Sequence, residues 1–104
     1  MFSVGTDIIK ISRIEKSIQK EHFKNSIFTN YEIEHCKNAE SFAGIFCAKE
    51  AYFKALGTGI NKKLNNIEVR HDEKGKPYLN GVENCDLSIS HDGDYAIASV
   101  IMWG

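Results

Sequence analysis

The chain has 104 residues and a mass of 11.7 kDa, a length that predicts one domain over residues 1–104 and no linker. Hydrophobic residues make up 42% and charged residues 26%, as in globular proteins, and the net charge of −1 argues against a strongly cationic nucleic-acid-binding protein. A chain this short buries only roughly 60–68% of its surface, so a site for a large ligand is expected to be shallow or shared between subunits.

The cysteines argue against structural cross-links. Cys36, Cys47 and Cys85 are odd in number and have no CxxC spacing, which is typical of neither a disulfide framework nor a zinc site. Cys47 lies in an apolar run and is expected to be a small buried residue rather than a nucleophile. Residues 1–10 lack a signal-peptide pattern, and no apolar stretch approaches the ~18 residues of a membrane span. These features predict a soluble protein of the reducing cytoplasm.

The N-terminal segment predicts a strand followed by a short helix. Residues 2–9 alternate loosely between apolar and polar side chains, and Asp7 lies near the end of this expected strand. Ser12 and Glu15 have the spacing of a capping box, which predicts a helix over residues 13–20.

Two more helices are expected before the middle of the chain. Thr29 and Glu32 repeat the capping-box spacing and predict a short helix to about residue 37. Residues 41–56 carry the strongest helical pattern, and Gly57 is a natural residue to end it. Because apolar residues occur on both faces, we expect this helix to be largely surrounded by protein.

The second half of the chain changes to a strand period. Two runs of alternation flank turn residues 73–77, and two more flank residues 92–94, where an Asp-Gly pair predicts a tight hairpin. The expected strands are residues 67–71, 78–79, 87–91 and 95–102. Early helices and late hairpins favour an α+β fold, with a mostly antiparallel sheet packed against the long helix.

Four groups of residues could carry chemistry, and each has a structural alternative. Asp7 could bind a ligand or only cap the turn after its strand. Glu50 and Lys54 are four residues apart and could form an ordinary ion pair, but charges on a helix with apolar faces are usually paired or bind a metal. Residues 57–59, Gly-Thr-Gly, could approach a phosphate or only end the helix. His91 is more often structural in such a position, and no role is assigned to His22, His35 or His71.

Taken in order along the chain, these segments resemble the holo-[acyl-carrier-protein] synthases, the small stand-alone type of 4′-phosphopantetheinyl transferase. The resemblance runs from residue 4 to residue 100. Its most specific segments are GTDI at residues 5–8, AKEA at 48–51, GTGI at 57–60, GKP at 75–77 and SISH at 88–91.

The resemblance implies a reaction and a fold. Members of the family transfer the phosphopantetheine arm of coenzyme A to a serine of an apo acyl carrier protein, which supports fatty acid biosynthesis, and they release adenosine 3′,5′-bisphosphate. A magnesium ion on the pyrophosphate assists this reaction, in which the protein supplies mainly positioning and electrostatic stabilisation. The family implies homotrimers with their sites between subunits, which would resolve the difficulty of enclosing coenzyme A in so short a chain.

The resemblance also implies roles for individual residues. Asp7 and Glu50 match the two metal-binding carboxylates, and Lys54 matches a lysine that stabilises charge on the leaving group. Lys49 has a less suitable helical phase than Lys54. The residue that accepts the serine proton would be Glu50 or a metal-bound water oriented by it, and the sequence leaves both open. Coenzyme A would be contacted by Lys54, Gly57, Thr58, Gly59, Lys76, Pro77 and His91.

Two positions depart from the family pattern. Ile45 and Ser26 stand where the family usually has arginines, the first of which helps to hold the 3′-phosphate of the nucleotide. Either Lys24, Lys62 or Lys63 substitutes, or coenzyme A is held more weakly. A relative that binds coenzyme A without turnover is therefore one alternative, and a nucleotide phosphohydrolase is another.

A basic helix side completes the expected sites. Arg13, Lys16 and Lys20 lie on one side of the helix expected over residues 13–20. Without the family match they would be an ordinary solvated surface. The resemblance implies that they bind the acidic acyl carrier protein.

Overall fold

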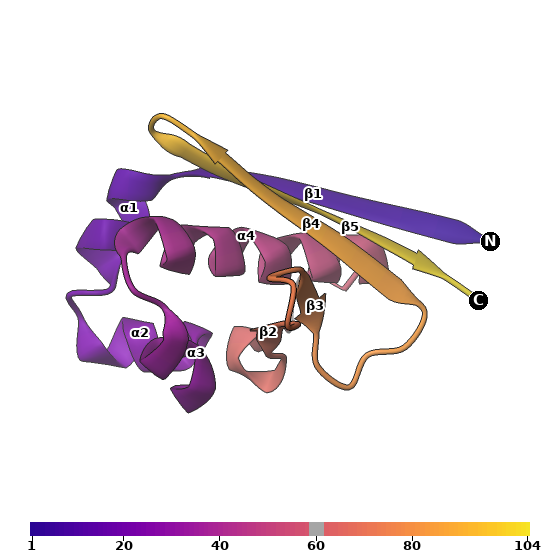
Figure 1. Cartoon of the computed structure of the whole chain (residues 1–104), viewed down its shortest axis with the longest axis horizontal. Coiled ribbons are helices and arrows are strands. Elements are labelled where there is room, and N and C mark those ends of the chain that lie inside the picture. Colours follow the sequence, from indigo (N-terminus) through magenta and orange to yellow (C-terminus); the bar gives the residue numbers. More distant parts are fainter. Residues whose placement is uncertain (59–61) are drawn as a thin grey trace.

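The computed structural model describes residues 1–58 and 62–104 and has an α+β fold (Figure 1). A three-stranded sheet lies on one side of the long helix α4, and helices α2 and α3 and a two-stranded sheet lie on its other side. Helix α1 lies beside the N-terminal end of α4. The elements in chain order are β1 (Phe2–Lys10), α1 (Ile11–Ser17), α2 (Glu21–Ile27), α3 (Asn30–His35), α4 (Ala39–Leu56), the 3₁₀ turn η1 (Leu64–Asn66), β2 (Val69–His71), β3 (Pro77–Leu79), β4 (Cys85–Asp92) and β5 (Tyr95–Trp103).

The predicted antiparallel sheet is confirmed. Its order is β1-β5-β4, and β2 and β3 form a separate antiparallel pair. The inner residues of β5 are small, with Ala96, Ala98 and Val100 fully or almost fully buried. Gly5 of β1 lies so close to α4 that a β-carbon there would be 1.9 Å from the Ala51 carbonyl oxygen. This close approach brings the middle of β1 onto the side of α4.

The other side of this sheet carries an exposed apolar surface. Side chains of β1 and β5 meet there in cross-strand pairs, and Thr6 and Ser99 share a 3.1 Å hydrogen bond in the middle. We call this surface the outer sheet face; its large apolar residues are Phe2, Val4, Ile8, Ile97, Ile101 and Trp103, which are 37 to 73% exposed. A large exposed apolar surface of this kind is characteristic of an interaction site.

Helix α4 has the predicted C-terminal end and the predicted burial. Asn38 caps its N-terminus by accepting a hydrogen bond from Ser41 N at 2.9 Å, so the helix begins at Ala39 rather than at residue 41. Gly57 ends it in the left-handed conformation, with φ of +76°. Because layers of protein lie on both sides of the helix, apolar side chains are buried around most of its circumference (Figure 1).

One capping box is confirmed and the other is wrong. Thr29 and Glu32 exchange both capping hydrogen bonds at the start of α3. The Ser12 box does not form, because β1 passes directly into α1 and Ile11 N donates to Asp94 O at 2.8 Å. The helix therefore begins at Ile11, which places Ser12 inside its first turn, and it ends at Ser17 instead of residue 20.

The sequence patterns missed α2 and overestimated β2. Helix α2 is short and polar, with one buried side chain, Ile27, so it has little apolar periodicity to detect. Strand β2 begins at Val69 rather than residue 67, because Ile67 ends the preceding 3₁₀ turn. The predicted turn between β2 and β3 is confirmed: Asp72 Oδ1 accepts hydrogen bonds from the backbone N–H groups of Lys74 and Lys76. No helix in the described ranges is long and apolar enough to cross a membrane.

Candidate functional site

Asp7 and Lys54 meet where β1 packs on α4. Lys54 Nζ lies 3.0 Å from Asp7 Oδ1 and also donates to the Thr6 carbonyl oxygen at 3.0 Å. The Asp7 side chain is 17% exposed, whereas that of Lys54 is 56% exposed. The ordinary Glu50–Lys54 ion pair that the spacing allows is not the one found: the close approach of β1 offers Lys54 a carboxylate from another element.

Glu50 is paired with Lys62 and only 12% exposed. Glu50 lies one helical turn beyond Cys47, and the charges of Asp7 and Glu50 both affect the pKa of the Cys47 thiol. Burial raises the pKa of Cys47 to about 12, and the charges of Asp7 and then Glu50 add to the increase. The thiol is buried and donates to the Ala96 carbonyl oxygen at 3.4 Å. Cys47 is therefore the inert buried residue that the sequence predicts, and the charges of both carboxylates act on its thiol.

The two carboxylates are chemically suited to a hard divalent cation. Within residues 1–58 and 62–104, no cluster of three or more His, Cys, Asp or Glu side chains could hold a metal ion by itself. Asp7 and Glu50 would therefore supply two oxygen donors, leaving other positions to water or phosphate. Mg²⁺ is commonly held in this way, by one or two carboxylates together with substrate phosphates.

The Gly-Thr-Gly segment is only partly described. Gly57 ends α4, and no atom of another described segment lies within 4 Å of where its β-carbon would be. Thr58 is exposed, and its N–H donates to the Phe53 carbonyl oxygen at 3.2 Å. Gly59 lies outside the described residues. The helix-ending role of Gly57 is thus confirmed, and a ligand-binding role for the segment stays a prediction.

A cavity of about 270 Å³ lies between α3, α4 and the strands that follow, and we call it the α3–α4 cavity. It brings together Pro77 and His91, two of the residues expected to contact coenzyme A, with Ile45, which stands where the family usually has an arginine. Lys76 lies elsewhere: its ammonium donates to Asp86 Oδ1 at 2.8 Å and to the Leu87 carbonyl oxygen at 3.1 Å.

Ser26, the second departure, lines a different groove. Lys62 and Lys63 line the same groove, so two of the three lysines considered as substitutes lie beside it. Lys24, the third, lies over the ring of Phe42, 5.6 Å from its centre. The expected carrier-binding residues Arg13 and Lys16 on α1, and Lys20 at the N-cap of α2, are all exposed.

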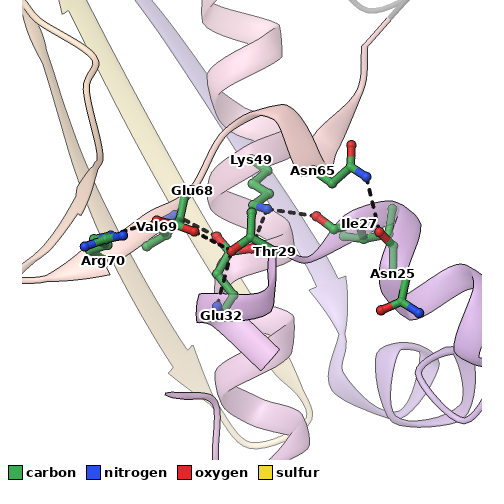
Figure 2. A network of polar contacts seen from close by, with 9 residues as sticks. All are labelled: Asn25, Ile27, Thr29, Glu32, Lys49, Asn65, Glu68, Val69 and Arg70. Carbon is green, nitrogen blue, oxygen red and sulfur yellow. Dashed lines mark hydrogen bonds and ion pairs between the residues drawn. The ribbon is translucent and has the colours of Figure 1, made fainter. Parts of the chain in front are cut away.

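Sequence reasoning missed a buried ion pair between Glu32 and Lys49, which Figure 2 shows. Lys49 Nζ lies 2.5 Å from Glu32 Oε1 and 2.8 Å from the Ile27 carbonyl oxygen, and both charged side chains are fully buried. Burial outweighs the attraction of Glu32 and lowers the pKa of Lys49. The apolar surroundings of Lys49 signal that it needs a partner, but only the fold identifies the partner.

The same network extends to β2. Glu32 Oε2 accepts from Val69 N at 2.6 Å, and the Thr29 hydroxyl donates to Glu68 at 2.6 Å (Figure 2). Arg70 in turn pairs with Glu68 at 2.7 Å. The network thereby joins α3 and β2 to α4, one residue before Glu50.

Comparison with known proteins gives a consistent family. The model of the 4′-phosphopantetheinyl transferase superfamily matches residues 3–100. A holo-[acyl-carrier-protein] synthase of Fusobacterium nucleatum is 42% identical over 120 residues, covering 98% of each chain. One from Halothermothrix orenii is 42% identical over 117 residues, covering 94% of each chain.

Solved structures agree. A holo-(acyl-carrier-protein) synthase of Bacillus anthracis, in complex with CoA (3′,5′-ADP), is 41% identical and superposes with a TM-score of 0.84 over 96% of this chain and 94% of its own. The Helicobacter pylori enzyme, in complex with coenzyme A, is 34% identical with a TM-score of 0.85, covering 96% of this chain and 99% of its own. The chain therefore belongs to the 4′-phosphopantetheinyl transferase superfamily and, within it, to the holo-[acyl-carrier-protein] synthases.

Proposed function

We propose that this chain, as one domain over residues 1–104, transfers the 4′-phosphopantetheine group of coenzyme A to a serine of an apo acyl carrier protein. Adenosine 3′,5′-bisphosphate is the second product, and the reaction serves fatty acid biosynthesis. The cysteines of the described chain are free thiols, which is consistent with a cytoplasmic enzyme. The observation that carries the proposal is the meeting of Asp7 and Lys54, with Glu50 close by, where β1 packs on α4.

The charges at this junction suit transfer of a phosphoryl group. Asp7 and Glu50 would hold Mg²⁺, which when bound supplies positive charge to the pyrophosphate of coenzyme A. Lys54 is the more exposed partner of its ion pair, so its ammonium is accessible to a phosphate oxygen. It would stabilise negative charge that develops on the leaving group.

The reaction exchanges one bond to phosphorus for another and releases the proton of the serine hydroxyl. The serine oxygen forms a bond to the phosphorus next to pantetheine, and the bond from that phosphorus to the bridging oxygen breaks. Its electron pair leaves with adenosine 3′,5′-bisphosphate, and the serine hydroxyl loses its proton. Glu50 would take this proton, directly or through a water molecule that it orients.

The α3–α4 cavity would receive the nucleotide end of coenzyme A. Its apolar walls, which include Ile45 and Pro77, suit a flat purine, and His91 lies at the same cavity. The Gly-Thr-Gly segment after α4 would line the path of the pantetheine arm, and Lys76 would contribute from beside β4.

The transfer assay tests this function. Apo acyl carrier protein incubated with the chain, coenzyme A and Mg²⁺ should gain the mass of phosphopantetheine, and a chelator should prevent the gain. Glu50→Gln should abolish the gain, whereas Glu83→Gln, a matched change at an exposed loop residue, should preserve it.

The outcomes of this assay separate the alternatives. Coenzyme A binding without any mass gain would identify a binding protein and overturn the proposal. Phosphate release from nucleotides without carrier protein would identify a phosphohydrolase instead.

The basic residues of α1 and the start of α2 would bind the carrier protein. Arg13, Lys16 and Lys20 are exposed, and acyl carrier proteins are acidic. Exposed charges are screened beyond ~8 Å at physiological ionic strength, so the KM for carrier protein should rise with salt. A KM that is independent of salt would contradict this assignment.

We also propose that the enzyme is a homotrimer whose sites lie between subunits. The outer sheet face supports an assembly because it leaves large apolar side chains of two paired strands exposed. Ile97→Asp should produce a monomer in sedimentation and reduce coenzyme A affinity and activity together. Lys37→Asp, at an exposed residue after α3, should leave the assembly intact. A fully active monomer would refute the shared site.

A further inference from the structure

The α3–α4 cavity has an unusual set of charges. Three imidazoles line it, from His35 at the end of α3, His71 at the end of β2 and His91 on β4. Among the described residues that line it there is no lysine or arginine. Every positive charge that the cavity walls can offer therefore depends on protonation of a histidine.

The hydrogen bonds of these rings leave a nitrogen available. His35 Nδ1 lies 2.7 Å from the Tyr31 carbonyl oxygen, which can only accept, so Nδ1 carries a proton. Its ring stacks on that of Tyr31 with 3.8 Å between centres, which fixes its orientation. His91 Nδ1 lies 3.2 Å from Glu40 Oε2. For both rings the hydrogen-bond contact found among the described residues is at Nδ1, so Nε2 can meet a ligand, and a second proton there adds a donor and a positive charge.

The other ionisable groups that line the cavity do not supply a positive charge in place of the histidines. Glu32 is neutralised by Lys49, and Cys36 stays a thiol because burial raises its pKa to about 12. Glu40 is the remaining carboxylate at the wall, and Tyr31 contributes a phenol.

The charged residues flanking β2 are engaged elsewhere. Arg70 is paired with Glu68 and lies over the Tyr31 ring. The Asp72 carboxylate accepts two backbone N–H groups of its own turn. The walls are thus net negative when the three histidines are neutral and net positive when they are protonated.

We propose that His35, His71 and His91 form a proton-dependent anion site that holds a phosphate of the nucleotide end of the substrate. The inference rests on the proposed function, because it places that end of coenzyme A in this cavity. Histidine is the side chain whose charge ordinarily changes between pH 5 and 8. Nucleotide affinity should therefore rise as the pH falls through this range, and binding near neutral pH should take up protons.

Calorimetry with adenosine 3′,5′-bisphosphate as the probe tests the inference. Binding enthalpies in two buffers of different ionisation enthalpy give the number of protons taken up. We expect net uptake at pH 7.2, where the phosphate monoester, whose second pKa is about 6, is mostly a dianion. The dissociation constant should be about tenfold larger at pH 8 than at pH 6.5, the effect of one charge-assisted hydrogen bond.

Variants assign the protons to the cavity. His35→Gln, His71→Gln and His91→Gln should each reduce the uptake, and the triple variant should remove it. His22→Gln, at an exposed histidine of α2, should leave it unchanged. Adenosine 5′-monophosphate lacks the 3′-phosphate and therefore shows which phosphate the histidines bind. Loss of proton uptake with this ligand indicates the 3′-phosphate. Retained proton uptake indicates the 5′-phosphate.

The results separate this inference from the function on which it rests. Binding without proton uptake, or uptake that survives in the triple variant, overturns the histidine site while transfer activity is retained. A chain that binds no nucleotide at any pH and transfers nothing overturns both.

Discussion

Replacing Glu32 with alanine should destabilise the fold severely, because it leaves the ammonium of Lys49 buried without its counter-ion. Both side chains are fully buried, and the Lys49 ammonium would keep one described partner, the Ile27 carbonyl oxygen. The same substitution removes the acceptor of two backbone N–H groups, those of Thr29 and Val69. The loss therefore combines an unpaired charge with unsatisfied donors.

The magnitude follows from these contacts. Removing one partner of a buried ion pair costs about 3–5 kcal/mol, and each stranded backbone donor adds about 1–3 kcal/mol if water does not reach it. We therefore expect Glu32→Ala to lower the free energy of unfolding by about 5 kcal/mol or more. Lys49→Met should cost about 3 kcal/mol, because the Glu32 carboxylate keeps its two backbone donors. Since domains have only about 5–15 kcal/mol of stability, Glu32→Ala approaches complete unfolding.

A double-mutant cycle measures the pair itself. Urea unfolding followed by circular dichroism, at one fixed protein concentration because assembly contributes to stability, gives the four free energies. Glu32→Gln keeps an acceptor for the Thr29 N–H, so the cycle of Glu32→Gln with Lys49→Met isolates the charge interaction. We expect a coupling of about 2 kcal/mol and a change within ~0.5 kcal/mol for the surface control Glu15→Ala. A coupling near zero would show that the pair is solvated in the native protein and would refute this reasoning.

Further predictions concern packing and pH. Gly5→Ala should lower the free energy of unfolding by about 3 kcal/mol, because the new methyl group would lie 1.9 Å from the Ala51 carbonyl oxygen; an unchanged urea midpoint would contradict this approach of β1 to α4. Gly44→Ala meets a side-chain methyl at 2.8 Å, and better helix propensity offsets part of that contact, so its cost should stay within ~1 kcal/mol in the same unfolding experiment. The Thr29 hydroxyl, and then Arg70, hold the pKa of Glu68 below its usual 4.5. Its stabilisation should be complete above pH 4.5 and lost as the pH falls through the lower folded-state pKa, so Glu68→Gln should be less stable than the parent at pH 7 and equally stable in strong acid.

Local patterns predicted the elements whose signals lie within them. The alternation of β1, β4 and β5, the capping pair Thr29 and Glu32 and the glycine that ends α4 all act over a few residues, and all are found in the structure. The predictions that are wrong concern segments whose local structure is determined by contacts with a neighbouring element. Ser12 has a suitable capping sequence, but the strand that passes directly into α1 moves the start of the helix two residues earlier, from residue 13 to Ile11.

The same distinction holds for the candidate site. Asp7, Glu50 and Lys54 are recognisable by type and order, but their pairing is not, because Lys54 takes its partner from β1 rather than from its own helix. The sequence indicates Glu32 as part of a helix cap and Lys49 as a charged residue in an apolar helix. Their contact depends on how α3 packs against α4, which no spacing within either helix encodes.

The pairing of β1 with β5 makes the site depend on contacts between distant parts of the sequence. Phe2 lies opposite Trp103 and Asp7 lies opposite Ala98, so β1 can join the sheet only when β5 is present. The contacts that place Asp7 beside α4 are therefore non-local, and such contacts form slowly because a long loop has to close first. A chain shortened before β5 would carry Asp7, Glu50 and Lys54 and still lack the strand that pairs with β1.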